Sequence, residues 1–511
     1  MTLASWRTVA LCTPVALVAA LAGCAATPPA VTPTAAVWIT TGDKTQLLAR
    51  NADVPIRRDG VADAADAAGT LQISVDATQR HQRMAGFGAS MTDASAWLIQ
   101  HRMSAPQREA LLRELFGRAD SRADSGAGQP GVGFDLTRLT IGASDFSRHH
   151  YSLNDLPPGV SSDPGLTHFS LAPNRDDVLP VMRQALAINP ALQVMASPWS
   201  APAWMKTSGS LIKGTLRDDA YGPFARYLLK YVDAMRAEGV PIFALTVQNE
   251  PHFEPDDYPG MRLMPPQRIR LLADQLGPLL KARTEARVVS PQIIDWDHNW
   301  DEPQSPRAVL SDPAARAVVS GIGWHCYAGD VAVQAQLQAE FPDKDGWFTE
   351  CSGGEWKPHW PETLPWLARH LVVGAVRGGA RGVLMWNLAL DEQFGPHKGG
   401  CKDCRGVVTI DSRSGAVTRN MEYYVLAHAS RFVRPGAQRI ASTDAAGPVD
   451  AASGPALRSV AFRNADDGSR VLVLVNSSAQ AQAVAVRDEA GRRFTQAVPP
   501  ASLVTLTWAG E

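Results

Sequence analysis

Two glutamates stand at the ends of short hydrophobic runs, and each leads into a turn that contains Pro or Gly. Glu250 follows the run at residues 243–249, and Glu350 follows the run at residues 346–349. A strand that ends on a carboxylate places it at the edge of a sheet, where barrels of parallel strands build their active sites. Two carboxylates facing one another across such an edge can hydrolyse a glycosidic bond.

Polar and aromatic side chains also gather at the ends of the other candidate strands. They are Asp93, Arg138, Trp199, Asn249, His325, Tyr327 and Trp386. Indole rings suit the C–H faces of a sugar, while Asp, Asn and Arg suit its hydroxyls. Each residue alone would more often be a turn or core residue, but together they occupy one level of one architecture. They predict a carbohydrate site rather than a phosphate site, which would need a basic cluster or a Gly-rich loop.

The elements that must position these residues alternate between strand and helix. Strands are predicted at residues 84–90, 134–141, 192–198, 243–248, 286–294, 318–324, 346–349 and 382–386, and helices at 106–116, 175–188, 221–238 and 266–284. This alternation is typical of parallel strands joined by crossover helices. Eight strands are the number that closes a (β/α)8 barrel, which we place at residues 81–430.

Beyond the barrel the pattern becomes short strands separated by turns. Residues 459–463, 469–476, 481–486 and 503–508 predict an all-β sandwich over residues 431–511. Residues 37–80 alternate in the same way, so we expect them to add strands to that domain. The expected fold is therefore α/β, a barrel with an additional β-sandwich.

The N-terminus has the features of an export signal. An apolar stretch at residues 9–21, too short to span a bilayer, ends in Leu-Ala-Gly-Cys24. This ending resembles a bacterial lipobox, which predicts a lipoprotein signal at residues 1–23, lipidation of Cys24 and a tether at residues 24–36. The alternative is an ordinary signal peptide with an incidental Cys. We expect an exported protein held by lipid at a membrane of the bacterial cell envelope, in the periplasm or at the outer membrane.

Four cysteines lie beyond the leader. Cys401 and Cys404 form a CxxC, which in an exported protein favours a local disulfide. A second CxxC or a nearby His pair, which a zinc site would need, is missing from the sequence. Cys326 and Cys351 each follow a predicted strand, and we expect two buried thiols near the pocket.

Composition and charge fit a soluble globular protein with a large core. The chain has 511 residues, of which 45% are hydrophobic and 20% charged, with a formal net charge of −2. This charge gives no reason to expect nucleic acid or an anionic membrane surface as a partner.

Five segments together resemble glycoside hydrolase family 30, close to its glucosylceramidase branch. They are residues 86–93 (GFGASMTD), 143–147 (ASDFS), 196–207 (ASPWSAPAWMKT), 246–251 (TVQNEP) and 386–390 (WNLAL). The resemblance runs from about residue 84 to the C-terminus. It implies a barrel with a side β-sandwich, a β-linked glucoside as substrate, and no metal or cofactor.

The resemblance also implies roles in a retaining mechanism. Glu350 matches the nucleophile and Glu250 the general acid/base, and Asn249 is placed to bond the sugar 2-hydroxyl. Asp93, Trp199 and Trp386 match sugar-binding positions. Arg138 and Tyr327 match residues around the nucleophile, and His325 matches a position at the rim of the pocket.

Several departures from the glucosylceramidase pattern leave the identity of the aglycone, the group attached to the sugar, undecided. Residues 391–405, which contain Cys401 and Cys404, and residues 352–354 differ from the glucosylceramidase pattern, and Cys326 replaces an aromatic residue. The first hypothesis is a retaining β-glucosidase of glucosylceramidase type, and the alternative is an endo-β-1,6-glucanase on the same scaffold. A β-xylosidase or fucosidase is further away, and a hypothesis from another class is a surface lipoprotein that binds glycans without cleaving them.

Overall fold

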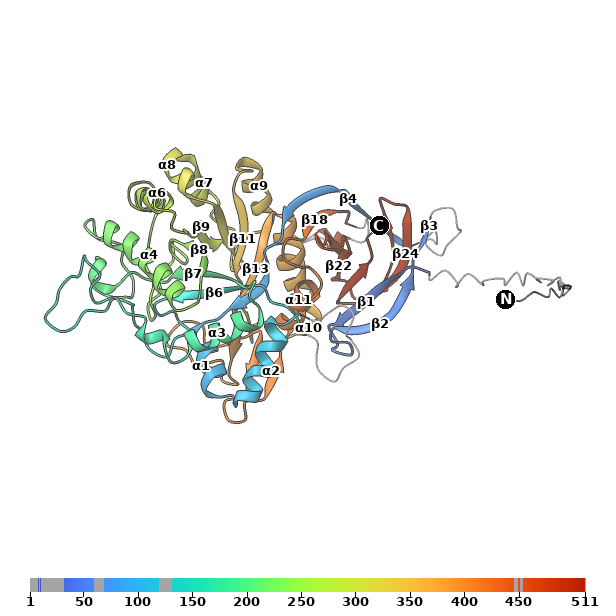
Figure 1. Cartoon of the computed structure of the whole chain (residues 1–511), viewed down its shortest axis with the longest axis horizontal. Helices are drawn as coiled ribbons and strands as arrows, with labels where there is room; N and C mark the ends of the chain where they lie inside the picture. The colour runs from blue at the N-terminus through green and yellow to red at the C-terminus, as the bar shows by residue number, and fades with distance from the viewer. Residues whose placement is uncertain are drawn as a thin grey trace, which may run out of the picture.

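The molecule has two parts that lie side by side, a barrel and a β domain (Figure 1). The computed structural model describes residues 32–58, 69–118, 131–444, 449–450 and 454–510, together with Thr8 and Ala10. Cys24 and most of the predicted leader and tether lie outside these residues. Among the residues that the structure describes, no helix is both long and apolar enough to cross a bilayer.

The barrel is closed by eight parallel strands, which confirms the predicted fold. The strands are β5 (Gly86–Ser90), β6 (Leu136–Ile141), β7 (Gln193–Pro198), β8 (Ile242–Thr246), β9 (Gln292–Asn299), β10 (Gly321–His325), β11 (Asp345–Glu350) and β13 (Ala380–Asn387). Seven of them lie close to their predicted positions. The fifth, β9, begins and ends later than predicted, and this difference matters for the site.

Helices surround the barrel. They are α1 (Asp93–His101), α2 (Ala105–Phe116), α3 (Val178–Ile188), α4 (Tyr221–Ala237), α5 (Pro265–Ile269), α6 (Gly277–Glu285), α7 (Gln304–Ser311), α8 (Pro313–Val318), α9 (Ala332–Glu340), α10 (Trp360–Leu367) and α11 (Met421–Ser430). The helix predicted at residues 266–284 is α5 and α6, joined by a π-helical segment at Arg270–Leu276. The start of α2 is fixed by a capping box. The side chain of Ser104 accepts a hydrogen bond from the backbone N–H of Gln107, and the side chain of Gln107 accepts one from the backbone N–H of Ser104.

The inside of the barrel has an apolar floor below a polar layer. Leu136, Met195 and Ala244 belong to a buried cluster with Trp347. Side chains two positions apart on a strand share a face. The residues two positions further along these strands are Arg138, Ser197 and Thr246, and they share hydrogen bonds with one another and with Asp297. The polar layer therefore lies toward the carboxyl ends of the strands.

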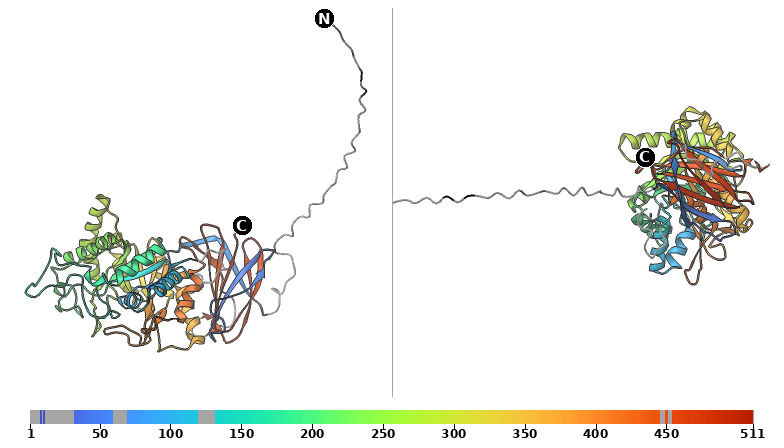
Figure 2. Two further views of the ribbon diagram at one scale, coloured as in Figure 1. Left: turned by 60° about the horizontal axis from the view of Figure 1, so that its bottom comes forward. Right: turned by 90° about the vertical axis from the view of Figure 1, so that its right-hand side faces the viewer.

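The β domain combines both ends of the chain, as the right-hand view of Figure 2 shows. Its ten-stranded sheet is ordered β2-β1-β25-β22-β21-β18-β4-β23-β24-β3. The strands are β1 (Thr34–Thr41), β2 (Ala49–Pro55), β3 (Arg57–Arg58), β4 (Leu71–Arg83), β18 (Gln438–Ser442), β21 (Leu457–Arg463), β22 (Arg470–Asn476), β23 (Gln482–Asp488), β24 (Arg492–Val498) and β25 (Ser502–Trp508). Of these, β18 and β24 were not among the predicted strands.

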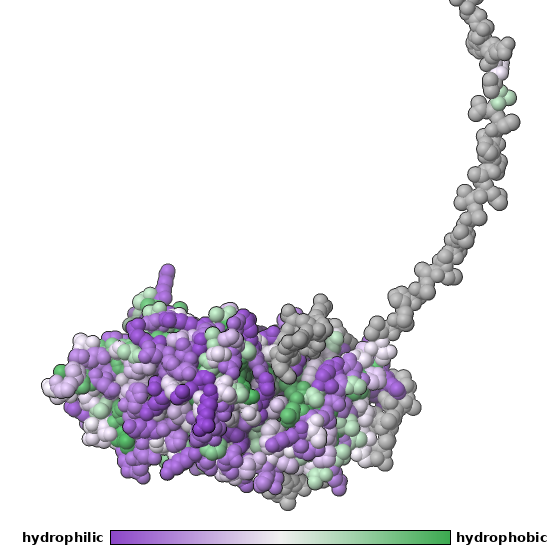
Figure 3. All heavy atoms as spheres, turned by 90° about the horizontal axis from the view of Figure 1, so that it is seen from below, coloured by the Kyte–Doolittle hydropathy of each residue, from purple (hydrophilic) through white to green (hydrophobic). Residues whose placement is uncertain are grey.

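Short strands complete the loops at the barrel mouth and elsewhere. They are β12 (Gly353–Gly354), β14 (Ala389–Leu390), β15 (Cys404–Arg405), β16 (Val408–Ile410), β17 (Val417–Arg419), β19 (Val449–Asp450) and β20 (Gly454–Pro455). The pair β12–β15 fastens the loop after β11 to the loop that contains Cys404. The face seen in Figure 3 is mostly hydrophilic with scattered apolar residues.

Candidate active site

A cavity of about 360 Å³ opens at the carboxyl ends of the barrel strands. Its walls combine acids, aromatic rings, histidine and a disulfide: Asp145, Trp199, Asn249, Glu250, Phe253, Tyr258, His298, Asn299, Tyr327, Glu350, Trp356, Trp386, Cys401 and Cys404. The structure thus brings together both predicted catalytic glutamates, three of the four predicted substrate-binding residues, and Tyr327.

Glu350 is held by two donors. It is the last residue of β11, and a register irregularity just before it, at Thr349, sets the direction of its side chain. Arg138 Nη1 donates to Glu350 Oε2 at 2.6 Å, and Tyr327 Oη donates to Glu350 Oε1 at 2.9 Å. Desolvation of its hydroxyl end and the charge of Glu350 raise the pKa of Tyr327 well above its usual value, so the phenol keeps its proton. Glu350 therefore presents an oriented carboxylate.

Arg138 is the centre of the polar layer. Its guanidinium is fully buried, and it donates to Asn249 Oδ1 and to Asp297 Oδ2, each at 2.7 Å. A buried cation is tolerated only when acceptors surround it, and here two carboxylates and an amide oxygen do so. Because Asn249 accepts from Arg138 through its oxygen, its amide N–H₂ is left to donate toward the cavity.

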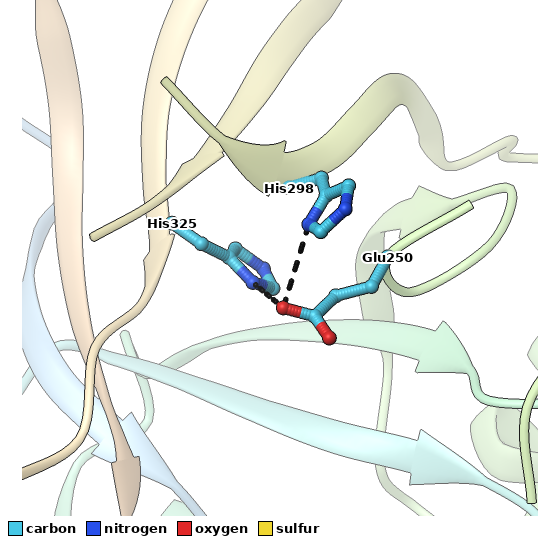
Figure 4. Close-up of side chains that lie close together, drawn as sticks. All are labelled: Glu250, His298 and His325. Carbon is cyan, nitrogen blue, oxygen red and sulfur yellow. Dashed lines mark hydrogen bonds and ion pairs between the residues drawn. The ribbon is translucent and has the colours of Figure 1, made fainter. Parts of the chain in front are cut away.

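Glu250 faces two histidines, as Figure 4 shows. Its Oε1 lies 3.1 Å from His325 Nδ1 and 3.4 Å from His298 Nδ1. The backbone of Glu250 has φ 45°, a left-handed conformation that is strained for a residue with a side chain. The turn after β8 is therefore strained, and its conformation directs the Glu250 carboxylate toward the histidines.

His325 lies between acids on both sides. Its Nε2 is 3.1 Å from Asp297 Oδ1, and its Nδ1 is 3.1 Å from Glu250 Oε1 and 3.9 Å from Glu350 Oε1. Burial lowers the pKa of His325, but these carboxylates outweigh it and raise the pKa to about 9. We conclude that His325 carries a positive charge at neutral pH and donates from both nitrogens.

The carboxyl groups respond to this environment. Burial raises the pKa of Glu250, but the nearby His298 and His325 outweigh it and lower the pKa to about 2. Burial likewise raises the pKa of Asp297, yet Arg138 and His325 hold it well below its usual range. Burial raises the pKa of Glu350, and the charges of His325 and Arg138 oppose that rise. These shifts favour an ionised Glu250 beside a protonated His325.

Asp297 and His298 are functional residues that the sequence reasoning did not identify. The predicted fifth strand ended at residue 294, whereas β9 continues to Asn299. Trp296 and Asp297 have φ 74° and 54°, and β9 bulges against β10 at this point. The bulge turns Asp297 toward Arg138 and His325. The run of polar and aromatic residues directly after the predicted strand was the available signal.

Glu250, His298 and His325 are also close enough to share a metal ion, because their ligand atoms lie within 4.8 Å of one another. A histidine binds metal through an unprotonated nitrogen. Both nitrogens of His325 already face carboxylates, and the raised pKa of this side chain opposes loss of a proton. The donor set therefore suits proton transfer better than metal coordination.

The two tryptophans form one wall. Trp199 and Trp386 stack with ring centroids 4.8 Å apart, and the Arg138 guanidinium lies over the Trp199 ring at 4.8 Å. A register irregularity in β13 at Trp386 turns this side chain toward the cavity. Their stacking leaves a rigid apolar surface beside Glu350.

Asp93 and Asp145 occupy different positions from one another. Asp93, predicted to bind sugar, is not among the residues that line the cavity, and its Oδ2 accepts from Ser147 and Tyr151 at 2.7 and 2.8 Å. Asp145 does line the cavity, and burial, reinforced by Glu350, raises its pKa well above the usual value. Asp145 is thus a further candidate to bond a sugar hydroxyl.

Two disulfides border the site. Cys401 and Cys404 form the expected local disulfide at the mouth. The expectation of two separate thiols at Cys326 and Cys351 is wrong, because they form a second disulfide with Cα atoms 5.3 Å apart. The physical reason is register: His325 and Glu350 are partners on adjacent strands, so the residues that follow them emerge side by side.

Comparison with known proteins gives a consistent result over nearly the whole described chain. The glycosyl hydrolase family 30 TIM-barrel domain matches residues 84–433, and the β-sandwich domain of the same family matches residues 436–506. An endo-1,6-β-D-glucanase of Trichoderma harzianum is 33% identical over 456 residues, which are 85% of this chain and 86% of that protein.

Two further relatives define the range of similarity. The lysosomal acid glucosylceramidase of Mus musculus is 28% identical over 465 residues, which are 86% of this chain and 83% of that protein. The solved structure of an endo-β1,6-glucanase superposes with a TM-score of 0.80 at 30% identity, covering 94% of this chain and 100% of that chain.

Proposed function

The chain belongs to glycosyl hydrolase family 30 and is a glycoside hydrolase, and we propose that it cleaves β-1,6-linked glucan with retention of configuration. One observation supports the mechanism above others. A single atom, His325 Nδ1, lies 3.1 Å from Glu250 and 3.9 Å from Glu350, so the two carboxylates face the same small space. Glu350 is also fixed by Arg138 and Tyr327, as an attacking carboxylate of a retaining glycosidase must be.

The first half of the reaction uses the oriented carboxylate. Glu350 attacks the anomeric carbon and forms a covalent glycosyl-enzyme, while Glu250 gives a proton to the leaving oxygen. Arg138 and Tyr327 keep the attacking oxygens in place through the two bonds to Glu350. In the second half Glu250 takes a proton from a water molecule whose oxygen attacks the anomeric carbon. The bond from this carbon to Glu350 breaks, which releases the sugar and restores the Glu350 carboxylate.

The proton on Glu250 needs a source, because His298 and His325 lower the pKa of this group. His325 carries a proton on the nitrogen that faces Glu250, 3.1 Å away. A bound sugar displaces water, and a less polar site favours the neutral pair over the charged pair. Substrate binding would then move the proton from His325 Nδ1 to Glu250 Oε1, along a hydrogen bond that already exists.

The choice of β-1,6-glucan over a glycolipid rests on the relatives and on the mouth. The relative named as an endo-1,6-β-D-glucanase is more similar to this chain than the glucosylceramidase is. The comparisons thus support the alternative drawn from the sequence better than the first hypothesis. The disulfide loop with Cys401 and Cys404 lines the cavity where the sequence departs from the glucosylceramidase pattern.

The test compares two substrates with one purified protein. We expect turnover of β-1,6-gluco-oligosaccharides to exceed that of glucosylceramide, and proton NMR of the first product to show the β-anomer. Preferred turnover of glucosylceramide would restore the first hypothesis, and an initial α-anomer would exclude retention. If a glycan binds but no bond is cleaved, the protein is a glycan-binding lipoprotein instead.

Export and lipid attachment at Cys24 are a separate proposal. Two disulfides among the described residues support an oxidising compartment outside the cytoplasm. Metabolic labelling with a radioactive fatty acid should mark the wild-type protein and leave a Cys24→Ala variant unmarked. Equal labelling of both proteins would show that another residue, or none, carries the lipid.

A further inference from the structure

A second cavity adjoins the catalytic one. It has a volume of about 420 Å³, within the range of small-molecule sites, and lies beside the loop after β11 and the start of α10. The two cavities share Tyr327 and Trp356 as lining residues. The two cavities therefore lie on either side of, or meet at, these two rings. The catalytic reaction described above uses only the first cavity.

Three aromatic rings at this second cavity are unusually exposed. Tyr327 is 44% exposed, Trp356 47% and Trp366 41%. Isolated apolar residues on a surface need no explanation, but several large rings around one hollow mark a binding site. Flat rings with one free face can stack on the C–H faces of sugars, as the sequence predicts for the catalytic cavity.

Trp356 is held in place by the backbone. A Cβ atom at Gly354 would lie 1.8 Å from the Trp356 ring, so only glycine lets the indole rest on the chain here. The loop itself is pinned, because Gly354 pairs with Cys404 and because Arg405 forms ion pairs with Glu355 and Glu422. One face of the indole thus packs on a fixed surface and the other remains open.

Polar groups line the second cavity together with the rings. Lys357 and Glu362 line the second cavity, and neither side chain makes a hydrogen bond or ion pair with any residue that the structure describes. Free donors and acceptors between aromatic faces suit a ligand with many hydroxyls. An alkyl chain would instead desolvate these charges without compensation.

We propose that the second cavity binds further glucosyl units of the glucan chain whose cleaved bond lies in the catalytic cavity. This inference rests on the proposed function and adds a specificity subsite to it. Trp356 and Trp366 provide the stacking surfaces, and Lys357 and Glu362 bond the hydroxyls. The subsite would favour long chains over single glucosides.

The experiment removes one aromatic ring and measures the effect on substrates of different length. Trp366 lines only the second cavity and touches neither glutamate, so Trp366→Ala removes a surface without disturbing the catalytic groups. We expect kcat/KM for β-1,6-gluco-oligosaccharides of four or more units to fall about tenfold, and kcat/KM for 4-nitrophenyl β-glucoside to stay unchanged. Trp366→Phe should retain most of the wild-type value. Val289→Ala, an exposed apolar residue just before β9 at the other end of the barrel, is the control.

A second variant shows whether a loss in Trp366→Ala comes from the missing ring or from a local folding defect. Gly354→Ala displaces the Trp356 ring and should also weaken long substrates more than the aryl glucoside. Equal losses of kcat/KM on both substrates in Trp366→Ala and Gly354→Ala would overturn the proposal of a glucan subsite. A loss of kcat/KM confined to glucosylceramide would also overturn it, because such a loss indicates a lipid site. A wild-type protein that cleaves 4-nitrophenyl β-glucoside but no β-1,6-linked chain would overturn the proposed substrate. A wild-type protein inactive on both would overturn the proposed function.

Discussion

Two histidines with no exposed surface show how differently the two halves of this molecule treat charge. His325 lies in the barrel mouth and His428 lies on α11, between the barrel and the β domain. Both nitrogens of His325 face carboxylates, which only accept, so both must carry protons. His428 instead meets hydroxyl groups, Thr505 Oγ1 at 2.8 Å and Thr40 Oγ1 at 2.9 Å.

The hydroxyls allow His428 to stay neutral. Thr505 donates its own proton to the carbonyl of His428, so Thr505 Oγ1 accepts from Nδ1–H, and Thr40 can donate to Nε2. Burial alone lowers the pKa of His428 to about 3, whereas the acids around His325 raise its pKa to about 9. Equal burial thus gives opposite charges, and the partners decide. The barrel mouth holds a charged histidine for chemistry, whereas at His428 the junction between the domains holds a neutral one for packing.

The largest expected effect comes from removing an acid on the charged side. Glu350→Gln keeps the shape but removes the attacking oxygen, so kcat should fall by on the order of 10⁴ or more. Circular dichroism and the melting temperature serve as the control for folding. A variant that keeps a tenth of the wild-type kcat would show that Glu350 is not the nucleophile.

The next effect separates the two histidines directly. His325→Gln should lower kcat by about 10²–10³, because Glu250 loses its proton partner. His428→Gln should leave kcat unchanged and lower the free energy of unfolding by about 1–3 kcal/mol, because buried hydroxyls lose a well-placed partner. Steady-state kinetics and urea unfolding measure the two quantities. Similar kcat losses in both variants would contradict the distinction drawn here.

The two disulfides offer a smaller contrast within the charged region. Cys326 and Cys351 directly follow His325 and Glu350, so replacing both with Ser should loosen the catalytic groups and lower kcat several-fold. Replacing Cys401 and Cys404 with Ser should raise KM with little change in kcat, because this disulfide lines only the mouth. A higher KM on loss of Cys326–Cys351 together with a lower kcat on loss of Cys401–Cys404 would show that the catalytic groups do not lie beside the first disulfide.

The smallest expected effect is the pH dependence of stability. The pKa of His325 rises from 6.5 to about 9 on folding, so its stabilisation is complete below pH 6.5 and is lost as pH rises toward 9. The pKa of His428 falls from 6.5 to about 3, so its contribution is present above pH 6.5 and is lost as pH falls. The melting temperature of each variant should be measured as a function of pH. Compared with the wild type, His325→Gln should show a smaller fall of the melting temperature at alkaline pH, and His428→Gln a smaller fall at acid pH. If each variant altered the opposite limb, the assigned charges would be wrong.

The sequence predicted the barrel because hydrophobic runs recur with a helix between them, and this signal is strong for all eight strands. It predicted Glu250, Glu350, Asn249 and Arg138 at one level because strand ends meet at one edge. It missed Asp297 because left-handed backbone at Trp296 and Asp297 lies inside a strand, where periodicity does not anticipate it.

Contacts between neighbouring strands were also harder to predict. The pairing of Cys326 with Cys351 depends on the register of β10 against β11, which spans a whole crossover helix. Trp356 owes its position to Gly354 and to a two-residue strand, β12, that is too short to leave a pattern. Positions fixed by such long-range packing cannot be read from local periodicity.

The position of β1 has a consequence for how the chain is made. This strand lies between β2 and β25, with Ala36 opposite Thr507 and Thr41 opposite Ser502. Synthesis proceeds from the N-terminus, so β1 emerges long before β25 and the complete barrel must be translated between them. During that interval β1 has an unpaired edge that can join other chains. Unfinished copies of this protein therefore need protection from aggregation until the last strand arrives.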